Sequence, residues 1–208
     1  MTLPHYTFSF TAGSALINET RTVTDEYLRC GDWTETEKNL LNSNALQKPK
    51  QSTTKRLINE IRIRLQSLTD AQLRLLAYGT GSDAKAMIWL AIAKRYAYIS
   101  DFASEVLLPK YASMDFILTE GDYLRFFNAK YATHPEMLKL SDASKGKIRG
   151  VLLLMLRQLG LLEADKSGRI IRPYLSHEAE QLVLADNPAH LTRFFYDESE
   201  IKKIQNHE

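Results

Sequence analysis

The sequence predicts a mainly α-helical protein with winged helix-turn-helix-like units and a short β-hairpin wing. Apolar residues recur at helical spacing along most of the 208 residues. Serine, threonine and glycine residues of the kind preferred in helix caps separate these periodic segments. Towards the carboxyl terminus, a long helical pattern is followed by a glycine-containing turn between two apolar pairs, Leu161-Leu162 and Ile170-Ile171. A helix followed by a hairpin is the order of a recognition helix and its wing.

The amino-terminal half is predicted to contain helices that begin at cap-type residues. The first helix spans about residues 14–30 and ends at Gly31, a residue suited to the left-handed helix cap. Residues 34–37 have the capping-box pattern and are expected to begin a short helix. Ser52 or Thr53 is expected to cap the long helix that follows.

The middle of the chain continues the helical pattern. A capping box at residues 69–72 begins one helix, and Ser82 or Asp83 is expected to begin a longer one that continues past Tyr96. Pro109 should block the next segment because its ring lacks the N–H group that a helix interior needs.

The last third of the chain has the element order of a winged helix. Thr119 is expected to open a helix, and a short helix at residues 136–139 leads into a long one capped by Ser141 or Asp142. The tight-turn sequence at residues 165–168 comes next. Helix, short helix, longer helix and hairpin follow one another as a winged helix-turn-helix requires.

Two domains are predicted from this order. Residues 1–115 would form an amino-terminal helical domain with a helix-turn-helix around residues 34–68. Residues 116–208 would form a carboxyl-terminal winged-helix-like domain. Its last helix is expected over about residues 176–186, and the final dozen residues are expected to be frayed.

Basic residues gather in two segments, although the formal net charge of the chain is only +2. From Leu46 to Arg64 there are six basic residues and one acid, and Arg62 and Arg64 lie off the apolar stripe of their helix. From Lys139 to Arg172 there are eight basic residues and three acids. Two such segments on an otherwise acidic chain favour one or two anion-binding faces. For either segment alone, a solvated helix face is an equally good explanation.

The basic residues stand where they do not stabilise a helix. Lys145, Lys147 and Arg149 would occupy the first turns of their helix, where cations oppose the macrodipole. A phosphate backbone outside the helix explains this placement. The sequence therefore predicts a DNA interface made of Lys48, Lys50, Ser52, Thr53, Lys55, Arg56, Ser144, Lys145, Lys147, Arg149, Lys166, Arg169 and Arg172.

The sequence lacks the residue patterns that would indicate an enzyme. Residues 79–85 resemble a phosphate-binding loop but lack the glycine and the hydroxyl residue that flank the lysine of a P-loop. Serine-x-x-lysine patterns at residues 52–55 and 82–85 lack the partner motifs of acyl transferases. The five histidines do not have the spacing of metal ligands. We therefore expect no enzymatic activity, no cofactor and no metal ion.

Cysteine content and hydropathy indicate the cellular compartment. Cys30 is the only cysteine, which excludes an internal disulfide framework and a thiolate metal cluster. The amino terminus lacks the pattern of a secretory signal. The longest strongly apolar stretch, residues 151–156, is far shorter than the roughly 18 residues that a spanning helix needs. We expect a soluble, cytoplasmic protein with no membrane association.

Several short pieces of the sequence match a known family in order and spacing. They are residues 6–13 with Glu19 and Trp33, 54–56 and 64–65, 95–96 and 101–102, 126–130, 134–136, 140–141, 147–149, 155–156 and 160–162. Together they resemble the BrxA family of bacteriophage exclusion (BREX) systems over roughly residues 6–195. The resemblance implies a mostly helical protein that is encoded with a methyltransferase, a phosphatase-like protein and ATPases in phage defence, and it implies double-stranded DNA binding. No catalytic motif carries over.

The leading hypothesis is a non-enzymatic, double-stranded DNA-binding component of a BREX-type defence system. Its partners would be double-stranded DNA and other BREX proteins. The alternative is a protein–protein adaptor whose basic faces dock onto acidic surfaces of larger defence proteins, so that DNA or RNA affinity is incidental. An RNA-binding helical module is a third hypothesis.

Overall fold

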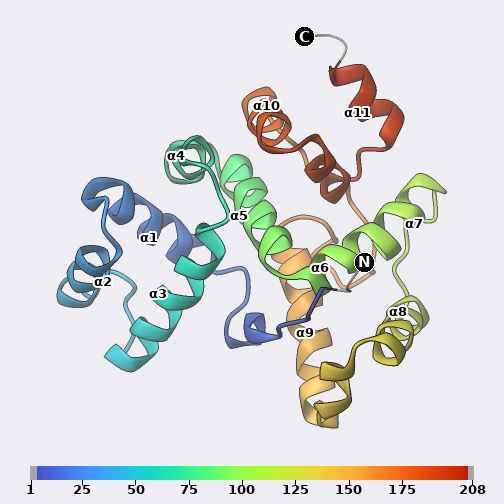
Figure 1. Cartoon of the computed structure of the whole chain (residues 1–208), viewed down its shortest axis with the longest axis horizontal. Helices are drawn as coiled ribbons and strands as arrows, with labels where there is room; N and C mark the ends of the chain where they lie inside the picture. Colours follow the sequence, from blue (N-terminus) through green and yellow to red (C-terminus); the bar gives the residue numbers. More distant parts are fainter. Residues whose placement is uncertain (1–3, 206–208) are drawn as a thin grey trace.

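Helix α5 (Gly81–Arg95) runs through the middle of the protein, and the other helices are arranged around it (Figure 1). The computed structural model describes residues 4–205. Every α5 residue from position 86 to position 93 is buried, which explains why this segment is apolar on all sides. The predicted mainly helical fold class is confirmed.

The amino-terminal side of the molecule consists of four helices: α1 (Ile17–Cys30), α2 (Trp33–Asn42), α3 (Gln51–Leu65) and α4 (Asp70–Tyr78). Gly31 ends α1 with a φ of 69°, as the sequence predicts. The cap of α2 is Asp32, not Thr34. The Asp32 carboxylate accepts hydrogen bonds from the backbone N–H groups of Thr34 and Glu35, both at 2.9 Å, and aspartate is a stronger cap than threonine.

Helices α4 and α5 both begin with a capping box. The predicted box at Thr69 is confirmed. The start of α5 differs from the prediction because Thr80 is its cap and Asp83 is the residue that reciprocates the hydrogen bond. Burial alone would raise the pKa of the Asp83 carboxyl, but hydrogen bonds from Ser176 and Thr80 lower it. The Asp83 carboxylate therefore also ties α5 to the segment that precedes the last helices.

The predicted long helix is divided at Tyr96, where φ is −113° and ψ is 96°. Pro109 does not break the next segment. It lies in the first turn of its helix, where an N–H group has no partner, and the preceding turn is widened to a π-helix. This segment consists of α6 (Ala97–Phe102), the π-helical turn η2 (Ala103–Leu107) and α7 (Leu108–Ala112).

The predicted caps at Thr119 and Ser141 are confirmed.

The prediction of a frayed tail is wrong for positions 198–205, which form a helix. Asp197 accepts a hydrogen bond from the Glu200 N–H at 2.8 Å, and Ile201 is buried. Residues 206–208 lie outside the described part. The remaining elements are η1 (Ser9–Ala12), α8 (Glu120–Thr133), η3 (Pro135–Lys139), α9 (Asp142–Gln158), α10 (His177–Asp186), η4 (Pro188–Phe194) and α11 (Glu198–Gln205).

The predicted β-hairpin wing is not confirmed, because no strand or sheet forms within residues 4–205. Two isolated antiparallel bridges join Ile117 to Arg169 and Leu162 to Ile170. The chain between Leu162 and Ile170 doubles back through a turn in which Lys166 has a φ of 67°. The segment therefore reverses direction as predicted, but its pairings are too short to be strands.

Within the described part of the chain, no helix combines the length and the apolar content needed to cross a membrane. The same residues contain no cluster of three or more His, Cys, Asp or Glu side chains that could hold a metal ion. Cys30 is a free thiol that donates a hydrogen bond to Glu26 at 3.2 Å.

The protein is expected to lose stability in mild acid because His190 is held in its neutral form. Nδ1 of His190 accepts a hydrogen bond from Arg193, and Nε2 lies 3.7 Å from a carboxylate oxygen of Asp186. Burial and the charge of Arg193 lower the pKa of His190 to about 4. In the unfolded chain this pKa is about 6.5, so protonation favours unfolding. We expect the free energy of unfolding to fall by up to about 3 kcal/mol as the pH drops from 6.5 to 4.

Urea unfolding at several pH values measures this loss. The control variant His190→Asn keeps a hydrogen-bond acceptor near the position of Nδ1 but does not titrate, so it should lose less stability over the same interval. An identical pH dependence in the two proteins would contradict the assignment to His190.

Candidate nucleic-acid interface

Residues 13–15 hold the carboxyl-terminal ends of α3 and α9 next to each other. The Arg64 guanidinium at the end of α3 donates to the Ser14 carbonyl at 2.9 Å. One residue further, the Ala15 N–H donates to Oε1 of Gln158, the last residue of α9, at 3.0 Å. Helix α3 and helix α9 therefore extend from a common point.

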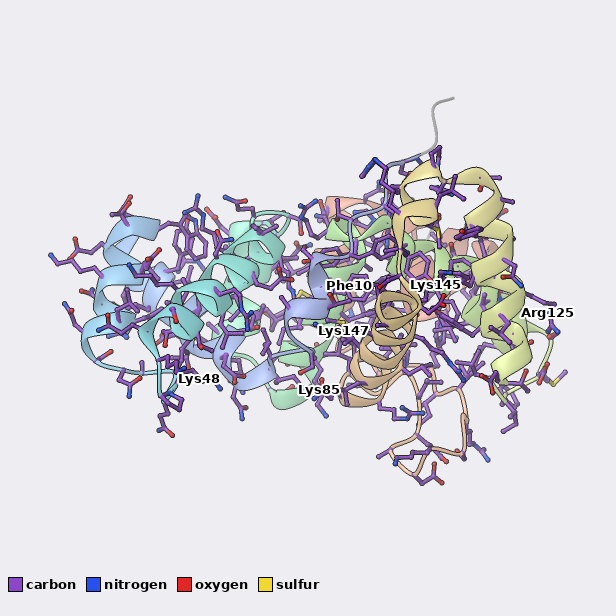
Figure 2. All side chains as sticks on the ribbon, turned by 90° about the horizontal axis from the view of Figure 1, so that it is seen from below. Phe10, Lys48, Lys85, Arg125, Lys145 and Lys147 are labelled. Carbon is purple, nitrogen blue, oxygen red and sulfur yellow. The ribbon has the colours of Figure 1, made fainter. Side chains whose placement is uncertain are left out.

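The amino-terminal ends of α3 and α9 lie at the same side of the molecule, the lower edge of Figure 1. Element η1 contacts both helices between them. Figure 2 looks onto this side, with Lys48 beside α3 and with Lys145 and Lys147 on α9. The beginnings of α3 and α9, which belong to two basic segments that are separate in the sequence, are thus brought to one side of the fold.

The exposed face of α3 carries no acid. Its one carboxylate, Glu60, is buried against Arg64. Lys55 and Arg56 are exposed and make no ion pair or hydrogen bond among the described residues. All exposed residues of α3 are neutral or basic: Gln51, Ser52, Lys55, Arg56, Asn59 and Arg62.

The predicted cap of α3 is wrong. Lys50 occupies the cap position with extended backbone and no side-chain hydrogen bond, so Ser52 and Thr53 lie in the first turn. Lys50 is exposed. Lys48 is half-buried and its Nζ lies 2.9 Å from Oε1 of Glu19. The Thr53 N–H donates to the Lys50 carbonyl at 3.0 Å, and without a side-chain cap the N–H groups of Gln51 and Ser52 remain open to an external acceptor.

The start of α9 is capped as predicted, and its cations are partly paired. Ser141 accepts a hydrogen bond from the Ser144 N–H at 3.2 Å. The Lys145 ammonium is 3.0 Å from Asp142, a contact that raises the pKa of Lys145. Lys147 is exposed and has no ion-pair partner in the described part of the chain.

Arg149, on the second turn of α9, is held by two contacts. It forms an ion pair with Glu120 at the start of α8, and its guanidinium carbon lies 5.6 Å from the centre of the Tyr123 ring. The Glu120 carboxylate is largely exposed. Exposed ion pairs of this kind contribute about 0–1 kcal/mol, so a phosphate could replace the carboxylate at little cost.

The three predicted DNA-binding cations after α9, Lys166, Arg169 and Arg172, differ in their exposure and in their ion pairs. Lys166 is exposed at the tip of the turn. Arg169 lies 3.7 Å from Glu163 in a loose, exposed pair. Arg172 is bonded to Glu200 at 2.7 Å and lies 4.0 Å above the Tyr196 ring, so it also packs the carboxyl-terminal helix onto the fold.

Two further cations beside α3, Arg62 and Lys38, were left out of the predicted interface. Arg62 is exposed on the same face of α3 as Lys55, and both line a hollow of about 380 Å³ between α2 and α3 with Lys38. Lys85 is also exposed, but it lies near the start of α5, beside α4 and away from the lower edge of Figure 1. The sequence already places Arg62 off the apolar stripe of its helix, and positions 55 and 62, which are seven residues apart, share one face.

Two glycines on the exposed side of α9 have no packing role. A Cβ atom at Gly146 or Gly150 would have no atom within 4 Å. Alanine is favoured over glycine in a helix interior by about 1 kcal/mol, so Gly146→Ala and Gly150→Ala should each raise the melting temperature by roughly 2–4 °C. Thermal unfolding followed by circular dichroism measures the shift. Gly79→Ala is the matched control and should destabilise, since its Cβ would lie 2.5 Å from the Leu75 carbonyl oxygen.

This chain is similar to a known protein family, to curated sequences and to a solved structure. The BrxA family model matches residues 4–187. A curated relative, "BREX protein BrxA" of Escherichia coli O9:H4 (strain HS), is 23% identical over 171 residues, which cover 82% of this chain and 80% of the relative. A second, "BREX protein BrxA" of Bacillus cereus (strain H3081.97), is 25% identical over 152 residues, which cover 73% and 76%.

A solved structure has the same fold. It is the "Crystal structure of an uncharacterized protein from Magnetospirillum magneticum", which superposes with a TM-score of 0.80 at 19% identity and covers 92% of this chain and 98% of its own. The family model spans nearly all of the chain, in agreement with the resemblance seen in the sequence. This chain belongs to the BrxA family.

Proposed function

We propose that this protein is a non-enzymatic, double-stranded DNA-binding component of a BREX phage-defence system. Family membership supports the system, since both curated relatives are named BREX proteins. The observation that carries DNA binding is the common orientation of α3 and α9, whose basic amino-terminal ends lie at one side of the molecule. A duplex laid across that side would meet both helices.

The carboxyl-terminal unit would bind DNA as a winged helix-turn-helix. Helix α8, the short η3 and α9 follow one another, and the turn after α9 comes back towards the fold. Backbone hydrogen bonds support this arrangement: the Ile170 N–H donates to the Phe116 carbonyl at 2.7 Å, and the Glu163 N–H donates to the Arg169 carbonyl at 2.9 Å. In this proposal the amino-terminal end of α9 lies against the duplex, and Lys166 and Arg169 hold the adjacent backbone.

The amino-terminal unit, α2 and α3, would make the second contact through Lys50, Lys55 and Arg56. These three cations are exposed, as is Lys147 on α9. With about six cations neutralising phosphates from the two units, the log–log dependence of affinity on salt should have a slope near −5.

Fluorescence anisotropy with a labelled duplex across a salt series tests the proposal. The expected result is tight binding at low salt, a slope near −5, and weaker competition by structured RNA than by duplex DNA. Absence of binding at low salt, or a slope near zero, would overturn it. Stronger competition by structured RNA would instead indicate an RNA-binding module.

A protein–protein adaptor is the second candidate, and exposed apolar side chains near the turn after α9 favour it. Met114 is 78% exposed, Tyr174 73% and Ile117 46%. Exposed apolar side chains are typical of protein interaction sites where they lie together. Recovery of a stoichiometric partner after nuclease treatment, with no duplex binding at physiological salt, would support this candidate.

A further inference from the structure

We propose that α3 and α9 have different roles on DNA: α3 reads base sequence through Arg56, Asn59 and Arg62, whereas α9 holds the phosphate backbone. This inference rests on the proposed DNA-binding function. It assigns the specificity-determining residues to the amino-terminal unit.

Three α3 side chains of the type that read base edges share one face. Asn59 is three residues after Arg56 and three before Arg62, so the three side chains are neighbours on the helix surface. All three are exposed, and none makes an ion pair or a side-chain hydrogen bond among the described residues. Arginine binds the O6 and N7 atoms of guanine in a bidentate manner, and asparagine binds N6 and N7 of adenine.

The rest of α3 supports such a position in the major groove. The opposite face, including Leu57, Ile58 and Ile61, is buried, so the polar face can only point outward. The other wall of the hollow that Lys55 and Arg62 line belongs to α2 and includes Trp33, Glu37 and Lys38. Lys38 is exposed and could bind a phosphate at the rim of the groove, as the first helix of a helix-turn-helix does.

Helix α9 has almost no side chains that could read bases. Its exposed positions are Asp142, Ala143, Gly146, Lys147, Gly150 and Leu154, with no amide or guanidinium group among them, and the Asp142 carboxylate is paired with Lys145 at 3.0 Å. The nearest guanidinium, that of Arg149, is engaged by Glu120 and Tyr123. A lysine acts as a point charge for phosphate, and backbone contacts fix position without carrying sequence information.

The test begins with selection of duplexes from a randomised library by the wild-type protein. Affinities for the selected duplex and for a scrambled duplex are then measured by anisotropy. Arg62→Lys keeps the charge and loses the bidentate fork, and Asn59→Ala removes the amide. Each should reduce the preference for the selected duplex about tenfold while leaving affinity for the scrambled duplex within about twofold.

Lys147→Gln on α9 is the matched control, since it also changes one exposed polar side chain. It should weaken binding to both duplexes equally and leave the preference intact. Unchanged melting temperatures would show that all three variants are folded. Selection of no preferred sequence, or a preference that survives in Arg62→Lys and Asn59→Ala, would overturn the inference while duplex binding itself stands. Failure of the wild type to bind any duplex would overturn the proposed function as well.

Discussion

Replacing Arg64 by leucine is expected to destabilise the protein by about 3–5 kcal/mol, because it leaves a buried carboxylate without its cation. Arg64 is 1% exposed, and its Nη2 lies 2.9 Å from Oε1 of Glu60, which is 5% exposed. Its other donors bond the carbonyls of Gly13 and Ser14. Leucine would fill part of the space but would satisfy none of these groups.

Urea unfolding at pH 7 measures the loss. Arg62→Leu is the matched control: it lies two residues earlier on the same helix, is exposed, and should change the free energy of unfolding by less than about 0.5 kcal/mol. The double variant Arg64→Leu/Glu60→Met removes both charges and should recover part of the loss. A loss below about 1 kcal/mol for Arg64→Leu alone would contradict a buried ion pair.

The Arg64 network also shows what the sequence could not reveal. Arg64 lies off the apolar stripe in a helical projection, which predicts exposure. In the structure it is buried because Glu60, Tyr96 and the carbonyls of Gly13 and Ser14 surround it, and Tyr96 donates a hydrogen bond to the Glu60 carboxylate. The Tyr96, Gly13 and Ser14 groups come from segments far from α3 in the chain, so no local pattern identifies them.

Helix boundaries were predictable where a single cap residue was present. Gly31, Thr69, Thr119 and Ser141 act at the positions that the sequence indicates, because each bonds backbone groups within three or four residues of itself. The start of α2 was misplaced because Asp32 stands just before the threonine that also fits a cap. Asp32 is the stronger cap of the two, so it sets the start of the helix.

The candidate interface was predictable in composition but not in arrangement. Charge counts identified both basic segments, since a cluster of lysines and arginines is a property of the sequence alone. The pairing of Arg149 with Glu120 and of Arg172 with Glu200 depends on packing between segments whose paired residues are 29 and 28 positions apart in the chain. For the same reason, the common orientation of α3 and α9 required the contacts made by residues 13–15.

Reversing the charge of Lys55, Arg56 and Lys147 together is expected to reduce duplex affinity by more than 100-fold at 100 mM salt, because these exposed cations have no carboxylate partner to release. Replacing all three by glutamate should also lower the magnitude of the log–log salt slope by about 2, since Lys55 and Lys147 are the two of them assigned to phosphates. Since all three side chains are exposed, the helical circular-dichroism signal and the melting temperature should stay close to those of the wild type.

A second triple variant separates local contacts from overall charge. Arg74 on α4 and Lys202 and Lys203 on α11 are exposed cations on helices at the upper edge of Figure 1, away from the amino-terminal ends of α3 and α9. Glutamate at these positions changes the net charge by the same amount. Long-range repulsion of DNA would then weaken both variants alike, whereas direct phosphate contacts would weaken only the first. Equal losses in the two variants would contradict the assigned interface, even if the wild type binds DNA tightly.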